Sequence, residues 1–260
     1  LGASLIGQLL EWFEWSSYAV FAPFIAAAFF DKSDPTSALL ATFGVFAVGF
    51  LVRPLGGIIF GRIADRVGRK NVLMMTIIIM ALSAVIIGVM PTYEQIGIWA
   101  SIILLLVRVI QGFAHGGESA TANSYIPEIA PRDRRGKWGS MVYMSIFGGS
   151  VIAYTLGGII SLVLSDEQIG AWGWRIPFWL GAAAAFVALY LRRHMQESEH
   201  FNEIQEGGAE SYDGLSATRP QTPVRSNWMN ILLVIGMVSG VTAAHYTWTS
   251  YISTLSLIHI

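Results

Sequence analysis

Polar side chains interrupt an apolar segment that begins ASIILLLVRV at position 100. Arg108, Gln111, His115 and Glu118 are spaced i, i+3, i+7 and i+10, so on a helix that turns about 100° per residue they fall within an arc of roughly 80°. A charge at the centre of a bilayer costs at least about 2.5 kcal/mol, and such groups therefore face a bundle interior or a wet cavity. The spacing predicts an inward-facing polar stripe that could bind protons or a charged substrate.

A second polar stripe lies near the amino end, where several residues share one helical face: Gln8, Glu11, Glu14 and Tyr18. Burial disfavours an ionised carboxylate and a nearby arginine favours it, so an acid under both influences can exchange protons near neutral pH. We assign proton coupling to Glu14 and Glu118 on this ground. His115 is a third candidate, because an unperturbed histidine has a pKa of about 6.5 and so also titrates close to neutral pH. A hydrogen-bonded packing histidine fits equally well.

Arginines within or beside the apolar segments are candidates for binding an anionic substrate, because the guanidinium presents a fixed fork to a carboxylate and stays charged. Arg53 lies in LVRPLGG, where Pro54 removes a backbone donor and can kink a helix. Arg175 follows two tryptophans, so interfacial anchoring is its alternative role. The predicted substrate-binding set is Arg53, Arg108, Arg175, Glu11, Tyr18 and Gln111. For Glu11 and Arg108, a structural ion pair remains the alternative.

The elements that position these residues are transmembrane helices. The chain is 54% hydrophobic and 13% charged, against roughly 25% charged residues in soluble domains. The chain contains seven apolar runs, each close to the roughly 20 residues that cross a bilayer as a helix. They lie at about 4–29, 38–60, 72–90, 97–127, 138–164, 175–192 and 228–254. They are continuous, whereas β-barrel strands alternate polar and apolar residues. Without cysteine, disulfides and thiolate metal sites are excluded, and the net charge of −1 gives no indication of nucleic-acid binding.

Basic residues indicate the orientation. They gather in alternate connections, at 62–70, 132–137 and 192–225, whereas the opposite connections contain only Lys32. Because positive loops face the cytoplasm, we expect the amino terminus and the acidic, Gly- and Pro-containing segment 194–226 to be cytoplasmic. That segment has the composition of a solvated linker.

The connection GRIADRVGRK at 61–70 resembles the G-x-x-x-D-R-x-G-R-K loop of the major facilitator superfamily. EWFEWSSYAVFAPF, RVIQGFAHGGE and WGWRIPF resemble its metabolite:proton symporter branch, which includes permeases for 2-oxoglutarate, shikimate, citrate and proline or betaine. GESATANSYIPEIA, ALYLRRHMQES and HYTWTSYIS are most similar to the 2-oxoglutarate permease group. The first helix departs from the branch, because Glu14 stands where the branch commonly has aspartate.

The resemblance implies an all-α integral membrane fold. We expect an N-terminal six-helix bundle of two inverted three-helix repeats over 1–193, the cytoplasmic linker 194–226, the first helix of a truncated C-terminal half over 227–254, and a non-native tail over 255–260. The resemblance also implies a gating loop that latches against the other half, formed by Gly61, Asp65, Arg66, Gly68, Arg69 and Lys70. Gly61 and Gly68 would permit tight turns, and a solvated basic loop is the alternative.

These features together predict a secondary active symporter in a bacterial cytoplasmic membrane. It would move a small organic acid, 2-oxoglutarate or a similar dicarboxylate, with the proton as coupling ion and with no metal or cofactor. The alternatives are shikimate or a zwitterion such as proline or betaine, whose ammonium Trp15, Tyr18 and Trp248 could hold by cation–π contact. A receptor or assembly subunit is a further alternative. An enzyme is not expected, because neither HxxxH nor GxSxG occurs. The expected partners are the substrate, the bilayer and the missing half.

Overall fold

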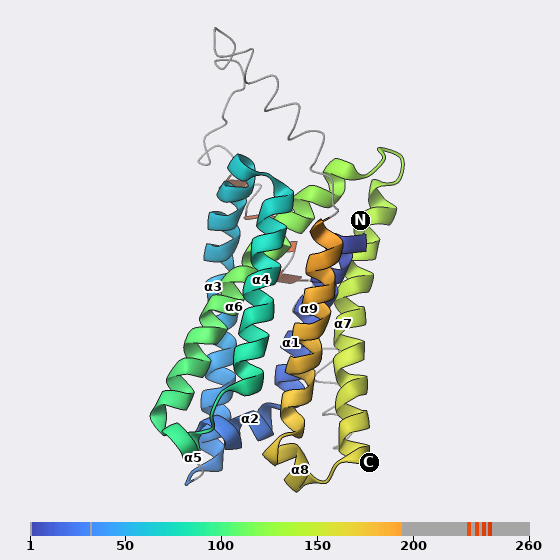
Figure 1. Cartoon of the computed structure of the whole chain (residues 1–260). Coiled ribbons are helices and arrows are strands. Elements are labelled where there is room, and N and C mark those ends of the chain that lie inside the picture. The colour runs from blue at the N-terminus through green and yellow to red at the C-terminus, as the bar shows by residue number, and fades with distance from the viewer. Residues whose placement is uncertain are drawn as a thin grey trace. The chain divides into compact units, whose positions relative to one another are not determined.

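The computed structural model describes residues 2–31 and 33–193, together with eight helical residues between 228 and 240. In residues 2–193 every regular element is a helix (Figure 1), which confirms the predicted all-α membrane class. The elements are α1 (Gly2–Val20), α2 (Ala22–Phe29), α3 (Pro35–Val67), α4 (Arg69–Val89), α5 (Tyr93–Ile96), α6 (Ile98–Ile129), α7 (Arg135–Val163), α8 (Asp166–Ala171), η1 (Gly173–Arg175) and α9 (Ile176–Arg193). Among them α3, α4, α6, α7 and the joined η1–α9 segment are long and apolar enough to cross a membrane.

The first predicted span is broken rather than continuous. Its helix ends at Val20, Phe21 has φ −96° and ψ 13°, and α2 then begins with Pro23 in its first turn. A proline clashes with the carbonyl four residues earlier and provides no N–H, so the break lies just before it. The backbone bonds from Phe21 to Ser17 and from Ile25 to Phe21 carry the chain across the break.

The basic connections meet at one end of the bundle. Figure 1 shows the α3–α4 connection, the α6–α7 connection, the start of α1 and the end of α9 at the same end, and α2, α5 and α8 at the other. This arrangement is what the alternating charge predicts. Which end faces the cytoplasm stays a prediction.

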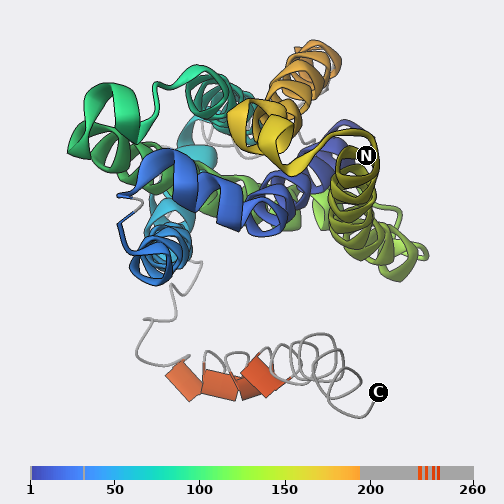
Figure 2. The same ribbon diagram turned by 90° about the horizontal axis from the view of Figure 1, so that it is seen from below.

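Helix pairing in residues 2–193 follows a repeat of three helices. α3 packs on α6 as α1 packs on α7, and α4 packs on α6 as α1 packs on α9, while α4 and α9 pack on each other. If each of the first three spans is exchanged with its counterpart in the second three, the same helix pairs result. In the view along the bundle, α1 lies between α3 and α7, with α4 and α9 along the remaining side (Figure 2). The pairing agrees with the predicted 3+3 repeat.

Glycines bring the helix backbones together at the two equivalent interfaces. A Cβ at Gly112 would collide with the carbonyl of Gly49, and one at Gly116 with the carbonyl of Arg53, so α6 lies directly on α3. At the equivalent interface, a Cβ at Gly149 would collide with the carbonyl of Leu9 on α1. Small residues permit this approach in membrane bundles, where lipid gives no hydrophobic drive for association.

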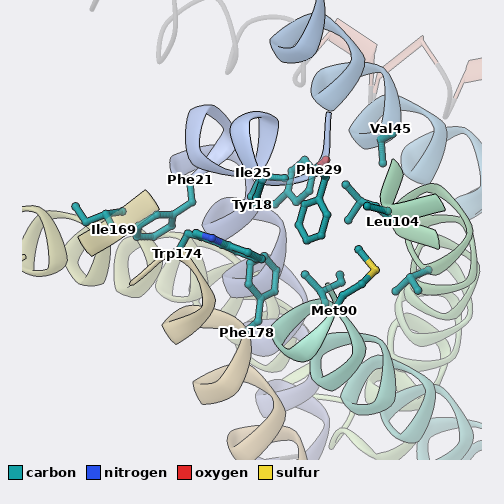
Figure 3. Packing of buried hydrophobic residues seen from close by; sticks show 14 of the residues in the cluster. Tyr18, Phe21, Ile25, Phe29, Val45, Met90, Leu104, Ile169, Trp174 and Phe178 are labelled. Carbon is teal, nitrogen blue, oxygen red and sulfur yellow. The ribbon is translucent and has the colours of Figure 1, made fainter. Parts of the chain in front are cut away.

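An apolar cluster fills the end of the bundle opposite the basic connections. Tyr18, Phe21, Phe29, Trp174 and Phe178 are buried in it (Figure 3). They come from α1, the break after it, α2, η1 and α9, so this end is sealed by large side chains. Within residues 2–193, packed apolar side chains therefore separate the deeper part of the bundle from this end.

Several predictions lie outside the described residues. They concern the linker 194–226, most of the seventh span 228–254 including Trp248, the tail 255–260, and Lys32. The predicted division of the chain into these parts stays a prediction.

Candidate functional site

The polar stripes of α1 and α6 meet inside the bundle, and α3 adds an arginine. Arg53 Nη1 lies 2.9 Å from Glu11 Oε1, and the Ser119 hydroxyl donates to Glu11 Oε2 at 3.0 Å. The Arg53 side chain is 16% exposed, whereas Glu11 is fully buried. Its guanidinium lies 4.5 Å from the ring centroid of Trp15 and 4.3 Å from that of Phe50. This ion pair therefore forms the partly exposed edge of the site.

A second acid and a second arginine lie deeper, joined through an amide. Arg108 Nη1 donates to Gln111 Oε1 at 2.7 Å, and Gln111 Nε2 donates to Glu14 Oε2. The Arg108 guanidinium stacks 3.8 Å from the ring centroid of Tyr18, whose hydroxyl donates to the Thr42 carbonyl at 3.1 Å. Arg108 Nε and Nη2 and Glu14 Oε1 have no hydrogen-bond partner among the described residues. One edge of this buried cation is thus unused.

His115 lies between the two carboxylates. Its Nδ1 is 3.9 Å from Glu11 Oε2 and its Nε2 is 3.7 Å from Glu14 Oε2. Both distances exceed a hydrogen bond, and within the described part of the chain neither ring nitrogen has a hydrogen-bond partner. The imidazole is fully buried, and its ring centroid lies 5.6 Å from that of Trp15. The imidazole is thus within 4 Å of both carboxylates, one from each ring nitrogen.

Helix geometry explains the convergence. Glu11 and Glu14 are one turn apart on α1, and Arg108, Gln111 and His115 are one turn apart on α6, so each set shares a face. The glycine contacts that hold α6 on α3 bring Arg53 within reach of α1. The structure therefore brings together these residues of the predicted set: Glu11, Glu14, Tyr18, Arg53, Arg108, Gln111 and His115.

Glu118 belongs to a different network, although it shares the α6 stripe. Arg192 of α9 donates from Nη1 to Glu118 Oε2 at 2.9 Å and from Nη2 to Oε1, and Thr76 of α4 donates to Oε2 at 2.6 Å. Arg192 also donates to the Leu73 carbonyl, and both charged side chains are fully buried. Arg192 is not among the site residues predicted from the sequence. A double arginine ending an apolar run was the available signal, but it reads as an ordinary interfacial anchor.

Arg175 lies away from the cluster, at the sealed end. Its Nη1 donates to the carbonyls of Gly88 and Met90 at 3.0 and 2.9 Å, and its guanidinium lies 4.5 Å from the Trp174 ring centroid. Trp179 Nε1 also donates to Gly88 at 3.1 Å. Basic side chains satisfy the free carbonyls at helix C-termini in this way. The structure thus gives Arg175 a capping contact with α4, and its substrate role stays untested.

The predicted gating loop is shorter than expected. The turn predicted at Gly61 is wrong, because α3 continues to Val67, and Gly68 alone breaks the helix with φ 96°. Glycine adopts this conformation without Cβ strain. Arg69 pairs with Asp65 at 2.6 Å and with Glu128 of α6 at 3.3 Å. Arg66 is exposed and Lys70 is half-buried. A latching role for these residues stays a prediction.

The bundle and its cluster define a class of protein. Acids, arginines and a histidine converge inside apolar helices, and large apolar side chains fill one end of the bundle. Among the described residues, Glu14, Arg108 and His115 have buried polar atoms without a hydrogen-bond partner. Ionisable groups placed this way in membrane proteins mark substrate or ion pathways. No group of three His, Asp or Glu side chains within the described residues is arranged to hold a metal ion. A multi-pass membrane transporter fits these observations.

Comparison with known protein families also indicates a membrane transporter. The model of the family described as sugar (and other) transporter matches residues 1–256, and the chain belongs to this family. A putative proline/betaine transporter of Staphylococcus haemolyticus is 42% identical over 97% of this chain and 53% of its own length. The alpha-ketoglutarate permease of Escherichia coli is 38% identical over 96% of this chain and 56% of its own length. The chain spans about half the length of the curated relatives it matches.

Solved structures show the same fold. The xylose transporter XylE from E. coli, in a partially occluded inward-open conformation, matches 80% of this chain and 50% of its own with a TM-score of 0.71 at 21% identity. A second XylE structure, described as a major facilitator superfamily proton:xylose symporter, matches with a TM-score of 0.70 at 20% identity. The likeness shows that the chain has the major facilitator fold.

Proposed function

We propose that this chain supplies the substrate and proton sites of a secondary active transporter that moves a small organic acid together with protons. The observation that carries the proposal is the unused edge of Arg108. Among the described residues its Nε and Nη2 are buried without an acceptor, and they are the two parallel donors that a carboxylate accepts in a bidentate pair. A buried charge without partners is costly, so binding a carboxylate here is favourable.

The acids supply the proton part of the proposal. Glu14, His115 and Glu11 form a continuous row, with His115 less than 4 Å from each carboxylate. With both acids ionised and the histidine neutral, Arg53 and Arg108 leave the cluster neutral. Each proton bound by an acid then adds one positive charge, which one carboxylate of the substrate cancels. Proton and organic anion would therefore enter together, and the proton gradient would drive uptake.

The same cluster favours an acid over a zwitterion. A quaternary ammonium needs the face of an aromatic ring, but the Arg53 guanidinium covers Trp15 and the Arg108 guanidinium covers Tyr18. An ammonium group would face like charges there. The second candidate, a betaine or proline substrate, is supported by the 42% identical relative with that name. In that case the substrate carboxylate would still use Arg108, and the ammonium would need other rings.

Uptake can be tested in a chimera in which residues 1–254 replace the matching part of the E. coli alpha-ketoglutarate permease. Labelled alpha-ketoglutarate should enter proteoliposomes when the outside is acidic, and a protonophore should abolish the uptake. Arg108→Gln should remove uptake, whereas Arg132→Gln, in the exposed α6–α7 connection, should not. Excess unlabelled succinate should compete and excess betaine should not. Uptake that ignores the proton gradient, or competition by betaine alone, would overturn the proposal.

The remaining expectations belong to the same proposal. The basic end of the bundle would face the cytoplasm of a bacterial cell, and a second half of the transporter would complete the pathway. The bound proton is the coupling ion, with no other cofactor. Reporter fusions at the two ends of α7 would test the orientation, because a phosphatase is active only outside the cytoplasm.

A further inference from the structure

Gln111 connects the proton acceptor to the anion-binding arginine, and chemistry fixes the orientation of its amide. A guanidinium has only donors, so the amide atom that faces Arg108 Nη1 at 2.7 Å must be the oxygen. The amide nitrogen then faces Glu14 Oε2 and donates to it. This arrangement requires an ionised Glu14, or at least a bare oxygen at Oε2, to accept that N–H.

A proton arriving at Glu14 meets a specific obstacle. His115 Nε2 lies 3.7 Å from Glu14 Oε2, so a proton passed through the imidazole reaches the oxygen that already accepts from Gln111. The other oxygen, Oε1, has no hydrogen-bond partner among the described residues and faces Gly181, where an added Cβ would lie 3.5 Å from it. A hydroxyl at Oε1 would be buried without an acceptor, which costs about 1–3 kcal/mol. Protonation at Oε2 avoids this cost when an organic carboxylate takes the place of the Gln111 oxygen on Arg108.

We propose that Gln111 is a switch, whose side-chain amide turns over when Glu14 takes up a proton and thereby frees Arg108 to bind the carboxylate of the substrate. The proton adds to Glu14 Oε2, and the new O–H donates to Gln111 Oε1 after the amide has rotated by half a turn. The amide nitrogen then faces Arg108 and accepts nothing from it. Arg108 Nη1 loses its acceptor and joins Nε and Nη2 in lacking one.

The charge around the switch changes in the same direction. Before the proton arrives, Glu14 offsets the charge of Arg108. Afterwards Arg108 is a buried cation with neither a counter-ion nor an acceptor in the part of the chain that the structure describes. An organic carboxylate restores both. Release works in reverse, since loss of the proton from Glu14 returns the amide oxygen to Arg108 in competition with the substrate. Gln111 is thus a positioning residue that makes proton and anion binding conditional on each other. The inference rests on the proposed function.

Other titratable groups face this region and must be kept in view. Glu11 lies one turn before Glu14 on the same face of α1, His115 of α6 lies between the two carboxylates, and Arg53 of α3 pairs with Glu11. From α9 the group against Glu14 is Gly181, which carries no charge. A test based on pH must therefore separate the effect of Gln111 from titration of Glu11 and His115.

The experiment measures the dissociation constant of alpha-ketoglutarate for the purified chain in lipid nanodiscs at about pH 6 and pH 8, by calorimetry. If binding takes up one proton, the dissociation constant should fall by up to about tenfold for each unit by which the pH decreases. In Gln111→Met, which keeps the length of the side chain but cannot relay, the slope should be lost. In Gln111→Glu, a carboxylate replaces the amide beside Arg108, and affinity should fall at both pH values.

The matched control is Thr121→Val, which removes a buried hydroxyl elsewhere on α6 and should keep the full slope. Circular dichroism and thermal unfolding show whether each variant is folded. A Gln111→Met chain that is folded and keeps the full pH slope would overturn the switch, because titration of Glu11 or His115 would then account for it. A chain that binds no alpha-ketoglutarate at either pH without any substitution would overturn the proposed function itself, and the switch with it.

Discussion

Two buried networks of glutamate and arginine lie on the same face of α6 and differ in one respect. Around Glu118, Arg192 and Thr76 donate to both carboxylate oxygens and Arg192 also donates to the Leu73 carbonyl. Around Glu14, one oxygen of the acid and two nitrogens of Arg108 have no hydrogen-bond partner among the described residues. The first network is closed, and the second is incomplete.

The comparison shows that burial of charge alone does not identify a site. A closed network has already satisfied its members, so a ligand could bind only by breaking existing bonds. An incomplete network leaves donors and acceptors in low dielectric, where they bind a complementary group strongly. This difference is why the proposed substrate and proton sites include the Glu14–Gln111–Arg108 network and not the Glu118–Arg192 network. The Glu118–Arg192 network ties α6 to α9 and α4, and so joins the two three-helix repeats.

The largest expected effect comes from breaking the closed network. Arg192→Met leaves Glu118 buried without its partner, and removal of one member of a buried ion pair typically costs about 3–5 kcal/mol. The free energy of unfolding, measured in detergent micelles, should fall by roughly that amount. Adding Glu118→Gln to Arg192→Met should recover most of the loss, because no unpaired charge remains. A single variant as stable as the unsubstituted chain would show that this network is not structural.

The next effect concerns the approach of α3 and α6, which positions Arg53. Gly116→Ala places a methyl group against the Arg53 carbonyl, and such overpacking costs about 1–3 kcal/mol. Gly158→Ala on α7 is the matched control, since no atom beyond its helix lies within 4 Å of the added Cβ. There the better helix propensity of alanine should leave stability unchanged or slightly higher. Equal destabilisation of both variants would contradict the close packing.

The helices and the polar faces could be predicted from the sequence, because both follow from local spacing. Arg108, Gln111 and His115 recur at one helical turn, and hydrocarbon excludes them wherever the helix goes. The division of the stripe into two networks could not be predicted. Glu118 is diverted by Arg192, which is 74 residues away and approaches only because α9 packs beside α4. No local pattern in the sequence encodes that contact.

Two departures in the backbone have local causes that spacing alone does not weigh. The apolar run 4–29 predicts one continuous span, yet Pro23 within it breaks the helix at Phe21. The motif at 61–70 was read as a loop, although its first seven residues continue α3 and only Gly68 leaves helical geometry. The hydrophobicity of a segment indicates which residues lie in the bilayer, whereas backbone hydrogen bonding and backbone conformation determine where a helix ends.

A smaller effect on stability, but a specific effect on binding, is expected at the incomplete network. Arg108→Lys keeps the charge and loses the fork that a carboxylate matches. The affinity for alpha-ketoglutarate should fall about 10- to 100-fold, corresponding to loss of one charge-assisted hydrogen bond of about 1.5–3 kcal/mol. Thermal unfolding should change much less than in Arg192→Met, because Arg108 makes one side-chain hydrogen bond to a described residue. Unchanged affinity would remove Arg108 from the substrate site.

The smallest effect on stability is expected at an exposed acid, Asp34, which serves as a comparison for the buried acids. Asp34 caps the start of α3 by accepting from the backbone N–H groups of Thr36 and Ser37 and from the Ser37 hydroxyl. The Ser37 hydrogen bonds hold the pKa of Asp34 below its usual value, because they favour the ionised form. A lowered native pKa stabilises the fold above the unfolded pKa, and this contribution disappears as the pH falls through the native value.

Asp34→Ala should therefore lower the unfolding temperature slightly at neutral pH, and the difference from the unsubstituted chain should vanish in acid, below the native pKa of the aspartate. Asp34→Asn separates charge from capping, because asparagine also caps a helix well and does not titrate in this range. It should retain part of the stability at neutral pH and show no such loss in acid. The difference in unfolding temperature between Asp34→Ala and the unsubstituted chain could instead stay constant down to strong acid. That outcome would mean that the charge of the Asp34 carboxylate does not stabilise this helix end.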